Sequence, residues 1–495
     1  MAAQHVPAVP ASTGSLQLGT PRGRWVLLAA VLGSGIALLD ATVVNIALPT
    51  LGRELGADFA DLQWTVNGYV LTLAALILLG GSLGDRFGRR RVFVLGTIWF
   101  GTASLLCGLA PDVEALIAAR VLQGVGAALL TPGSLALLQA SFGPADRARA
   151  VGAWSGLGGI AAAVGPFLGG LLVEVSWRLV FLINLPLCAV VVVVALRHVP
   201  ESQDPEAAPR VDVLGAFLGA LGLAGITYAL VAAGERGGSA GVLVAAVVGT
   251  VALVGFVVVE RRSRHPMLPV DIFTSRQFTA ANLVTFAVYA ALGGVFFLLI
   301  VHLQVMAGFA PLAAGTALLP VTAAMLLLSS RAGALAARIG PRLPMTAGPL
   351  LCAAGVLLMR RIGPRASYVL DVLPAVTVFG LGLAATVAPL TVTVLAAAPS
   401  RHAGLASGVN NAVARTAGLL AVAVLPLAAG LSDPAAPAAF EQGFDTAMLL
   451  AAGLLGAGAA VAFLGVRDDE VRRSRRQPDR AVHCAVDGPP VQIRP

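Results

Sequence analysis

Fourteen apolar runs, each long enough to cross a lipid bilayer, follow one another along this 495-residue chain. A transmembrane helix needs about 20 mainly apolar residues to span the hydrocarbon core. The runs lie near residues 26–48, 62–82, 92–110, 114–139, 149–173, 179–197, 213–233, 240–259, 279–305, 312–336, 344–360, 368–397, 403–431 and 445–466. Only 12% of the residues are charged, far fewer than a soluble domain needs on its surface. The sequence therefore predicts an all-α polytopic membrane protein embedded in a lipid bilayer.

Arginines and acidic residues alternate between the predicted loops. The basic clusters are Arg86, Arg89, Arg90 and Arg91, then Arg261, Arg262 and Arg264, and in the tail Arg467, Arg472, Arg473 and Arg475; the acidic residues are Asp58, Asp61, Asp112, Glu114, Asp433 and Glu441. Positive loops face the cytoplasm, so we expect both termini there. One loop, with Arg360, Arg361 and Arg365, disagrees with this pattern. The Ala-, Gly- and Arg-rich composition suggests a bacterial cytoplasmic membrane.

The basic charge and the missing lysine exclude two classes of partner. A net charge of +8 would suit nucleic acid, but the arginines lie in short loops where membrane orientation requires them. The chain contains no lysine, and a Walker A loop needs lysine on the nucleotide phosphates, so a pump driven by ATP in that way is excluded. The spans offer no nucleophile–base pair and no set of metal ligands. We expect no enzyme, no metal and no cofactor.

An internal repeat predicts the division of the chain. The segment Gly81–Arg89 after the second run returns as Gly333–Arg342 after the tenth run. A separation of eight runs fits two six-helix bundles with two helices inserted between them, and repeats that flank a central site are typical of transporters. The predicted parts are a cytoplasmic N-terminal tail (1–24), a first bundle (25–198), a linker with two extra helices (199–265), a second bundle (266–466) and a disordered C-terminal tail (467–495).

Asp40 and Arg120 are charged residues deep inside predicted spans. Burying such a residue costs about 2.5–3.5 kcal/mol on insertion scales, so each needs a reason to be there. A carboxyl group in apolar surroundings binds a proton more readily than one in water, and proton-coupled transport requires such a group. The alternatives are an aspartate that only hydrogen-bonds neighbouring helices and an arginine that only binds backbone carbonyls.

Glycines mark two further segments. In the first copy of the repeat, Gly81 and Gly88 allow a tight turn, and Asp85 can meet the positive N-terminus of a helix in the other bundle. Arg86 and Arg89 of that copy can anchor to phosphates and carbonyls, although membrane orientation alone also explains them. In the second copy Ala337 replaces the aspartate. In the fifth run, the thin face formed by Gly165, Gly169 and Gly170 permits close helix approach, and Pro166 predicts a kink; simple packing is the alternative reading.

Substrate contacts are expected where polar and aromatic side chains enter the spans. An apolar pocket with a few polar anchors suits a small molecule. The candidates are Trp64, Asn67, Tyr69, Gln123, Phe297 and Gln304. Packing or a position at the membrane interface is the alternative for each of them. His302, near the end of the ninth run, is expected at the aqueous boundary.

The order of these motifs resembles that of the major facilitator superfamily, and specifically its fourteen-helix drug:proton antiporter branch. The resemblance covers all fourteen runs and is carried by Leu39–Pro49, Gly81–Arg91, Arg120–Gly126, Ala161–Gly170, Trp177–Pro186 and Gly404–Asn410. It implies that Gly81–Arg91 acts as a gate latch and that the Gly165-Pro166 motif accompanies antiport. It also implies that Arg120 assists proton transfer or pairs with Asp40.

The resemblance implies a proton-coupled antiporter that exports drugs or other amphiphilic molecules by alternating access, with the proton gradient as its energy source. Dedicated export of a self-made antibiotic or siderophore is the nearest alternative. A proton-coupled uptake permease fits the glycine-proline motif less well. A membrane receptor or scaffold would show no proton flux on adding substrate.

Overall fold

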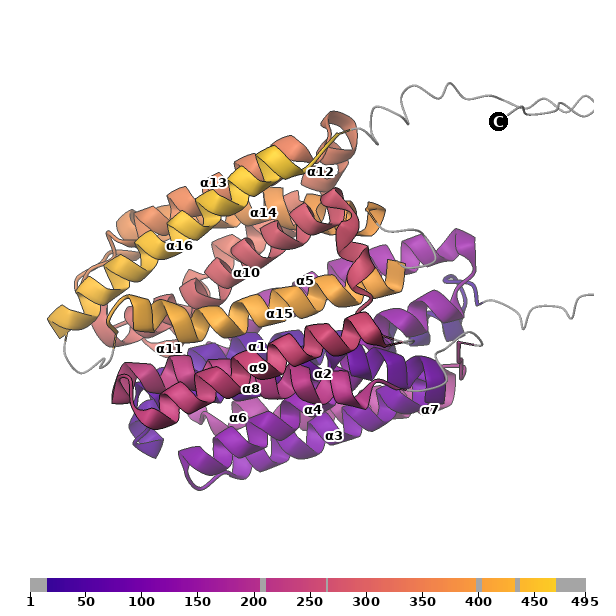
Figure 1. Ribbon diagram of the computed structural model, residues 1–495, viewed down its shortest axis with the longest axis horizontal. Helices are drawn as coiled ribbons and strands as arrows, with labels where there is room; N and C mark the ends of the chain where they lie inside the picture. The colour runs from indigo at the N-terminus through magenta and orange to yellow at the C-terminus, as the bar shows by residue number, and fades with distance from the viewer. Residues whose placement is uncertain (1–15, 205–210, 264–265, 398–402, 432–436, 469–495) are drawn as a thin grey trace, which may run out of the picture.

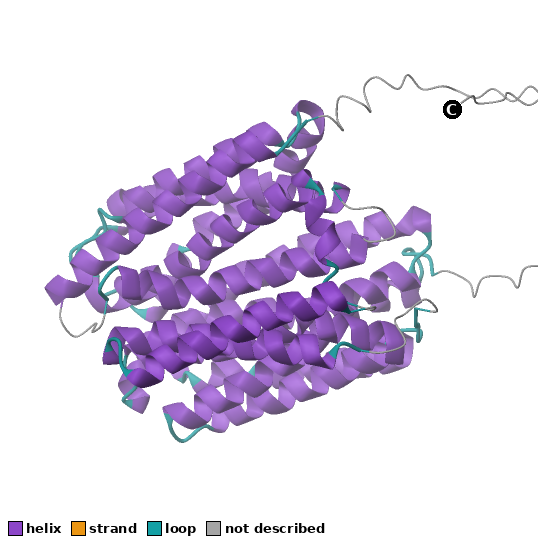
Figure 2. Ribbon diagram, in the orientation of Figure 1, coloured by secondary structure: helices purple, strands orange, loops and turns teal. Residues whose placement is uncertain are grey.

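The computed structural model describes residues 16–204, 211–263, 266–397, 403–431 and 437–468. Within these ranges the chain is helical, joined by short loops, and a single isolated bridge links Leu16 and Phe142 (Figure 2). The α-helices are α1 Pro21–Leu55, α2 Phe59–Phe87, α3 Arg89–Leu109, α4 Val113–Ser141, α5 Pro144–Val175, α6 Arg178–Leu182, α7 Asn184–His198, α8 Val213–Arg236, α9 Ala240–Arg262, α10 Arg276–Val301, α11 Pro311–Ala317, α12 Leu319–Ile339, α13 Arg342–Met359, α14 Leu373–Ala396, α15 Ala403–Ala428 and α16 Pro437–Gly465. A 3₁₀-helix, η1 (Val270–Thr274), and two π-helices, η2 (His302–Met306) and η3 (Tyr368–Val372), complete them.

The number of membrane spans agrees with the sequence. Thirteen helical segments are long and apolar enough to cross a bilayer, and α5 extends for 32 residues through the fifth predicted run. The sixth, ninth, tenth and twelfth runs each contain two elements: α6–α7, α10–η2, α11–α12 and η3–α14. The chain is therefore a multi-pass membrane protein with an all-α fold of about fourteen spanning segments. The predicted tails lie mostly outside the described residues.

Two helical bundles meet along two seams (Figure 1). At one seam α2 packs against α15, and at the other α5 packs against α11 and α12. Helices α8 and α9 pack on each other, and α8 also contacts both α2 and α15. The pair that connects the bundles in sequence therefore covers the α2–α15 seam.

Acidic residues in alternate loops begin helices. Asp58 and Asp61 form a reciprocal capping box at the start of α2, and Asp112 accepts a hydrogen bond from the backbone N–H of Ala115 at 2.8 Å. Carboxylates at these positions satisfy backbone donors and complement the helix dipole. In the loop that departs from the charge pattern, Arg360 forms an ion pair with Asp445 of α16 at 3.2 Å. A carboxylate thus neutralises part of this exceptional positive charge.

The two copies of the repeat form the same kind of turn. Gly88, before α3, has a φ of +112°, and Gly340, just before α13, has a φ of +101°. Only glycine adopts such backbone angles without strain. A carboxylate from the end of each bundle lies at each turn: Glu201 accepts from the backbone N–H of Arg90 at 3.0 Å, and Asp468 accepts from that of Arg342 at 3.1 Å. The two copies of the repeat therefore share a backbone structure as well as a sequence pattern.

Candidate functional site: a buried ion pair between the helices of the first bundle

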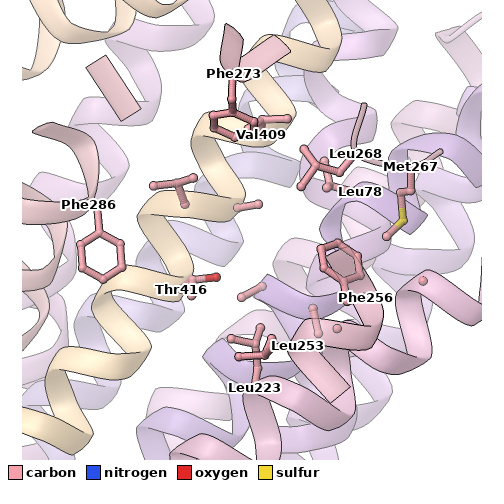
Figure 3. Close-up of a pocket in the computed structure, with 16 residues that line it drawn as sticks. Leu78, Leu223, Leu253, Phe256, Met267, Leu268, Phe273, Phe286, Val409 and Thr416 are labelled. Carbon is pink, nitrogen blue, oxygen red and sulfur yellow. The ribbon is translucent and has the colours of Figure 1, made fainter. Parts of the chain in front are cut away.

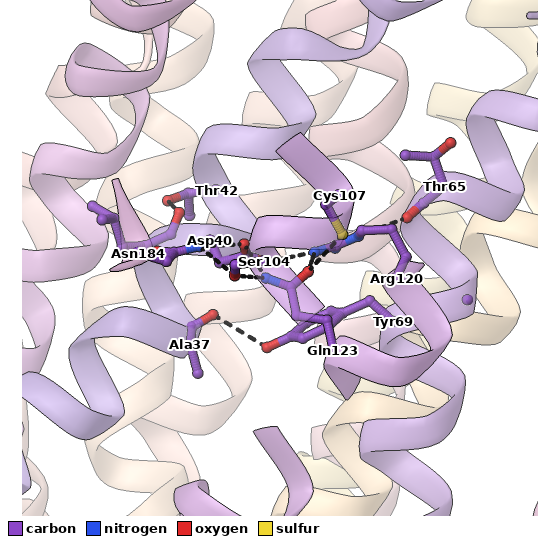
Figure 4. A network of polar contacts seen from close by, with 12 residues as sticks. Ala37, Asp40, Thr42, Thr65, Tyr69, Ser104, Cys107, Arg120, Gln123 and Asn184 are labelled. Carbon is purple, nitrogen blue, oxygen red and sulfur yellow. Dashed lines mark hydrogen bonds and ion pairs between the residues drawn. The ribbon is translucent and has the colours of Figure 1, made fainter. Parts of the chain in front are cut away.

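The polar core of the first bundle is built around Asp40 of α1 and Arg120 of α4 (Figure 4). An Arg120 Nη1 donates to Asp40 Oδ2 at 2.5 Å, and both side chains are almost completely buried. The other carboxylate oxygen, Oδ1, accepts from Gln123 Nε2 at 2.8 Å and from Asn184 Nδ2 at 3.0 Å. Ser104 of α3 accepts from these same two amides. Four helices thus contribute to a single hydrogen-bonded ion pair.

The guanidinium of Arg120 is held on several sides. Its Nε donates to the carbonyl of Thr65 at 3.0 Å, and its Nη1 also donates to Gln123 Oε1 at 2.5 Å. The guanidinium carbon lies 4.3 Å from the ring centroid of Tyr69, in a cation–π contact. A buried pair of this kind is stable only while both charges are present, because removing one leaves the other uncompensated. Loss of charge on Asp40 must therefore displace Arg120 or leave it unpaired.

The six residues expected to contact substrate lie in different places. Tyr69 and Gln123 belong to the ion-pair cluster. Trp64 packs on Tyr228 of α8, with ring centroids 6.3 Å apart. Asn67 is fully buried, and neither its amide nitrogen nor its amide oxygen has a hydrogen-bond partner within the described residues. Among the six candidates, Asn67 is thus the one whose buried amide has no hydrogen-bond partner in the described part of the chain.

Phe297 and Gln304 lie where the bundles touch. Phe297 packs on Phe59 of α2, with ring centroids 5.6 Å apart, and Gln304 Nε2 donates to the carbonyl of Ile46 in α1 at 2.9 Å. These contacts join the C-terminal end of α1 and the N-terminal end of α2 to the second bundle. The two side chains are therefore engaged in contacts between the bundles.

His302 is not at an aqueous boundary, contrary to the sequence-based expectation. Its ring is fully buried and stacks on Phe444 at 3.9 Å. Its Nε2 lies 2.6 Å from the carbonyl oxygen of Ile362. The expectation was wrong because distance along a helix does not reveal that α16 covers this side chain.

The residues of the glycine-rich turn make contacts within their own bundle. Asp85 Oδ1 accepts from Arg89 Nη2 at 2.7 Å, and Asp85 is bonded to no helix of the second bundle in the described residues. Arg86 lies over the ring of Phe87. Gly81 faces α4, where an added Cβ would lie 3.7 Å from Pro132. The carboxylate therefore meets its own turn here, not a helix N-terminus across the seam.

The glycine face of α5 contacts both bundles. A Cβ on Gly165 would collide with the Thr42 hydroxyl of α1, and one on Gly169 would lie 3.1 Å from the Cα of Val43. Gly170 faces α11 instead, where a Cβ would come within 2.5 Å of Leu312 Cα. Pro166 lies within α5, and its carbonyl approaches Gly315 of α11. Small residues therefore permit the close approach of α5 to α1 and to α11.

An apolar pocket of about 250 Å³ lies beside the α2–α15 seam, beneath α8 and α9 (Figure 3). Thr416 supplies its single polar side chain; the other lining residues are apolar, among them Leu78, Leu223, Phe256 and Phe286. None of the six expected substrate contacts lines it. The pocket contains no charge and offers no chemistry beyond the burial of an apolar group.

Comparison with known proteins identifies the family. A model described as the Major Facilitator Superfamily matches residues 30–423. The chain belongs to the major facilitator superfamily. Members of this superfamily are transporters, so the chain is a membrane transporter that handles small molecules within the bilayer.

Its curated relatives in the superfamily are resistance and export proteins. The chain is 36% identical to the puromycin resistance protein of Streptomyces alboniger, covering 93% of this chain and 94% of that protein. It is also 36% identical to the tetracenomycin C resistance and export protein of Streptomyces glaucescens, over 82% and 76% of the two chains. The multidrug resistance protein Stp of Mycobacterium tuberculosis matches at 36%, over 83% and 77%. All three of these relatives are named for resistance to drugs or antibiotics, and one of them also for export.

Solved structures agree on the fold of this superfamily member. A bacterial homologue of the human lysosomal transporter Spinster, crystallised in an inward-facing and unoccupied conformation, superposes with a TM-score of 0.64 at 17% identity, covering 93% of this chain and 100% of that one. A D-xylose–proton symporter gives a TM-score of 0.64 at 14% identity, over 90% and 99%. At these identities the likeness concerns the fold alone.

Three polar residues in the interior of this transporter were not predicted as site residues from the sequence. Ser104 and Asn184 were missed because only tertiary packing brings α3 and α7 to Asp40. Arg415, near the middle of α15, was missed although a charge inside the apolar run 403–431 is itself a signal.

Proposed function

We propose that this chain is a proton-coupled antiporter that exports drugs or other amphiphilic small molecules across the bacterial cytoplasmic membrane by alternating access. The observation that carries the proposal is the buried ion pair of Asp40 and Arg120, with its two amide donors. An ionisable pair of this kind in the interior of a spanning bundle is costly to maintain and is typical of a proton or ion pathway. The resistance and export names of the relatives support the direction of transport.

Proton binding at Asp40 would be coupled to movement through its partner. Protonation removes the charge of the carboxylate, and Arg120 then lacks its counter-ion in a dry environment. The guanidinium must reorient, or α1 and α4 must shift, before the site becomes stable again. Release of the proton to the other side restores the pair. Each proton that passes thus drives one change in the packing of the first bundle.

Contacts between the bundles suggest what this change acts on. Gln63 Nε2 donates to the carbonyl of Val422 at 2.6 Å, and Gln304 donates to that of Ile46. Both bonds join the C-terminal end of α1 or the N-terminal end of α2 to the second bundle. Under the proposed topology these ends face outward, so these bonds must break for the exporter to open to the exterior.

Gradient-driven efflux from proteoliposomes tests the proposal. The native protein is compared with Asp40→Asn and Asp40→Glu, using a panel of lipophilic cations and antibiotics and an imposed proton gradient. We expect gradient-dependent efflux by the native protein, a loss of about 100-fold or more in Asp40→Asn, and partial activity in Asp40→Glu, which keeps a titratable carboxyl.

The matched control is Asp271→Asn, which changes an exposed carboxylate in η1 and should leave efflux unchanged. Folding of each variant is checked by its elution as a single species after solubilisation. Efflux that persists at native rates in Asp40→Asn would move the proton site to another residue. Efflux whose rate does not depend on the proton gradient would refute antiport.

Dedicated export of a self-made metabolite is the second candidate. Relatives named as a probable actinorhodin transporter of Streptomyces coelicolor and as a tetracenomycin C resistance and export protein favour it. The same ion pair would serve both functions. Breadth of substrate separates them: a drug exporter moves several unrelated compounds of the panel, whereas a dedicated exporter moves one chemical type.

A further inference from the structure

Arg415 is a cation inside the bilayer region without a counter-ion in the described residues. It lies near the middle of α15 and is partly buried. Arg415 takes part in none of the ion pairs found among the described residues. Its guanidinium also has no hydrogen-bond partner among these residues. Arg120, at a similar depth, has Asp40. A lone arginine at this depth is as costly as a lone carboxylate, so its retention needs an explanation.

The position of Arg415 on α15 directs it toward the first bundle. It lies seven residues, or about two turns, before Val422 and therefore shares its face of the helix. The carbonyl of Val422 is the one that accepts from Gln63 of α2 across the seam. At the other end of the seam, a Cβ on Gly408 would lie 3.2 Å from Leu78 of α2. Arg415 thus lies between two points where α15 touches α2.

These two contacts also fix which residues of α2 are level with Arg415. The pairs Gln63–Val422 and Leu78–Gly408 show that the helices are antiparallel. Interpolation places Val70 level with Arg415 and the unpartnered Asn67 about 4.5 Å further along the axis. Asn67 and Gln63 are one turn apart, so both side chains lie on the face of α2 that points to α15. The free amide and the free guanidinium therefore approach the same part of the seam.

A tyrosine of the second bundle completes these surroundings. The backbone carbonyl of Tyr289 in α10 faces Gly418, one turn from Arg415 on α15, where an added Cβ would lie 3.8 Å away. Tyr69 of α2 lies two residues, or about 200°, from Asn67 and directs its ring to Arg120 of the first bundle instead. The seam thus presents one uncompensated positive charge, one free amide and one tyrosine, contributed by both bundles.

We propose that Arg415 binds an anionic group of the exported molecule, namely a carboxylate or another planar oxyanion carried on an aromatic scaffold. The guanidinium fork matches a planar oxyanion with two parallel hydrogen bonds. The amide of Asn67 adds a third donor, and the ring of Tyr289 contacts the apolar scaffold. The proposal rests on the proposed export function and names its substrate class. It places the substrate's charge on the second bundle and the proton on the first.

Equilibrium binding to the purified full-length protein tests the proposal. The probes are 1-naphthoate and its uncharged amide, 1-naphthamide, which share size and ring. We expect the native protein to bind the carboxylate about tenfold or more tightly than the amide, as hydrogen bonds between charged groups would give. In Arg415→Gln the ratio should fall to about one. In Arg415→Lys, which keeps the charge but loses the fork, it should be about threefold.

Arg365→Gln is the matched control, because Arg365 is an exposed arginine of the loop between α13 and η3, and its ratio should equal the native one. A native ratio near one, or a ratio that survives Arg415→Gln, overturns the proposal. If Arg415→Gln abolishes gradient-driven efflux but leaves the ratio intact, Arg415 is instead an alternative partner of Asp40. The binding ratio is measured without a proton gradient, so it fails or holds independently of the proposed antiport.

Discussion

The interior of the first bundle holds an ion pair, whereas the corresponding interior of the second bundle holds a neutral network. Asp40 and Arg120 share their charge with Gln123, Asn184 and Ser104. In the second bundle, Asn410 of α15 donates to Asn282 Oδ1 at 3.2 Å and to Thr285 Oγ1 at 2.7 Å in α10. Both networks tie helices together, but only the first contains a carboxylate and its counter-ion.

Under the proposed antiport, this difference would divide the work of transport between the bundles. A neutral amide network does not change with proton concentration, so it would hold its helices together throughout the cycle. The ion pair would have two states, and its helices would respond to the proton. The helical framework, including the two glycine turns, is the same in both bundles, but the ion pair is present only in the first. Three predictions test how far this contrast extends.

The largest expected effect is on the ion pair. Arg120→Ala leaves a buried carboxylate without its counter-ion and should lower the free energy of unfolding by about 3–5 kcal/mol. Thermal unfolding of the solubilised protein measures this. The double variant Asp40→Asn, Arg120→Ala removes both charges and should lose clearly less than the sum of the two single variants. Additive losses would show that the two side chains do not stabilise each other.

An intermediate effect is expected at the repeated turns. Gly88→Ala and Gly340→Ala force a side chain into a φ near +100° and against Glu201 or Asp468. Each should cost about 2 kcal/mol. Because the frame is repeated, the two losses in thermal stability should agree closely. A large loss at Gly88 with none at Gly340 would mean that the two bundles differ in their frames as well as in their chemistry.

The smallest effect is expected in the neutral network. Asn410→Ala removes one donor from Asn282 and Thr285 and should cost about 1 kcal/mol. Gradient-driven efflux should keep its dependence on the proton gradient. Asn411→Ala, the exposed neighbour on the same helix, serves as the control and should be silent in both measurements. If efflux in Asn410→Ala lost its dependence on the gradient, proton coupling would extend into the second bundle.

Periodic apolar runs made the fold predictable from the sequence. A span leaves about twenty apolar residues in a row, so the helices and their approximate ends follow from hydropathy alone. The repeat around Gly88 was visible because a positive φ admits little besides glycine. Asp40 and Arg120 were visible because charge is rare in a span. The role of each remains a prediction.

The neighbours of these residues were less predictable. Ser104 and Asn184 are ordinary polar residues whose positions matter only because α3 and α7 pack against α1. Tyr69 and Gln123, which the sequence predicts as substrate contacts, lie against the guanidinium of Arg120. These neighbours could not be predicted because helical periodicity gives the face on which a side chain lies but not the helix that covers that face. Arg415, in contrast, could have been found by the same rule that found Arg120.

In each bundle, a carboxylate near the end of the bundle bonds to the start of one of its earlier helices. Glu201, beyond the end of α7, reaches back to the start of α3, and Asp468, beyond the end of α16, reaches back to the start of α13. Each of these bonds ties the end of a bundle to one of that bundle's earlier helices. Under the proposed antiport, a change at Asp40 would therefore move the first bundle as a unit rather than let one helix slide, and the contacts at the seams would break and re-form.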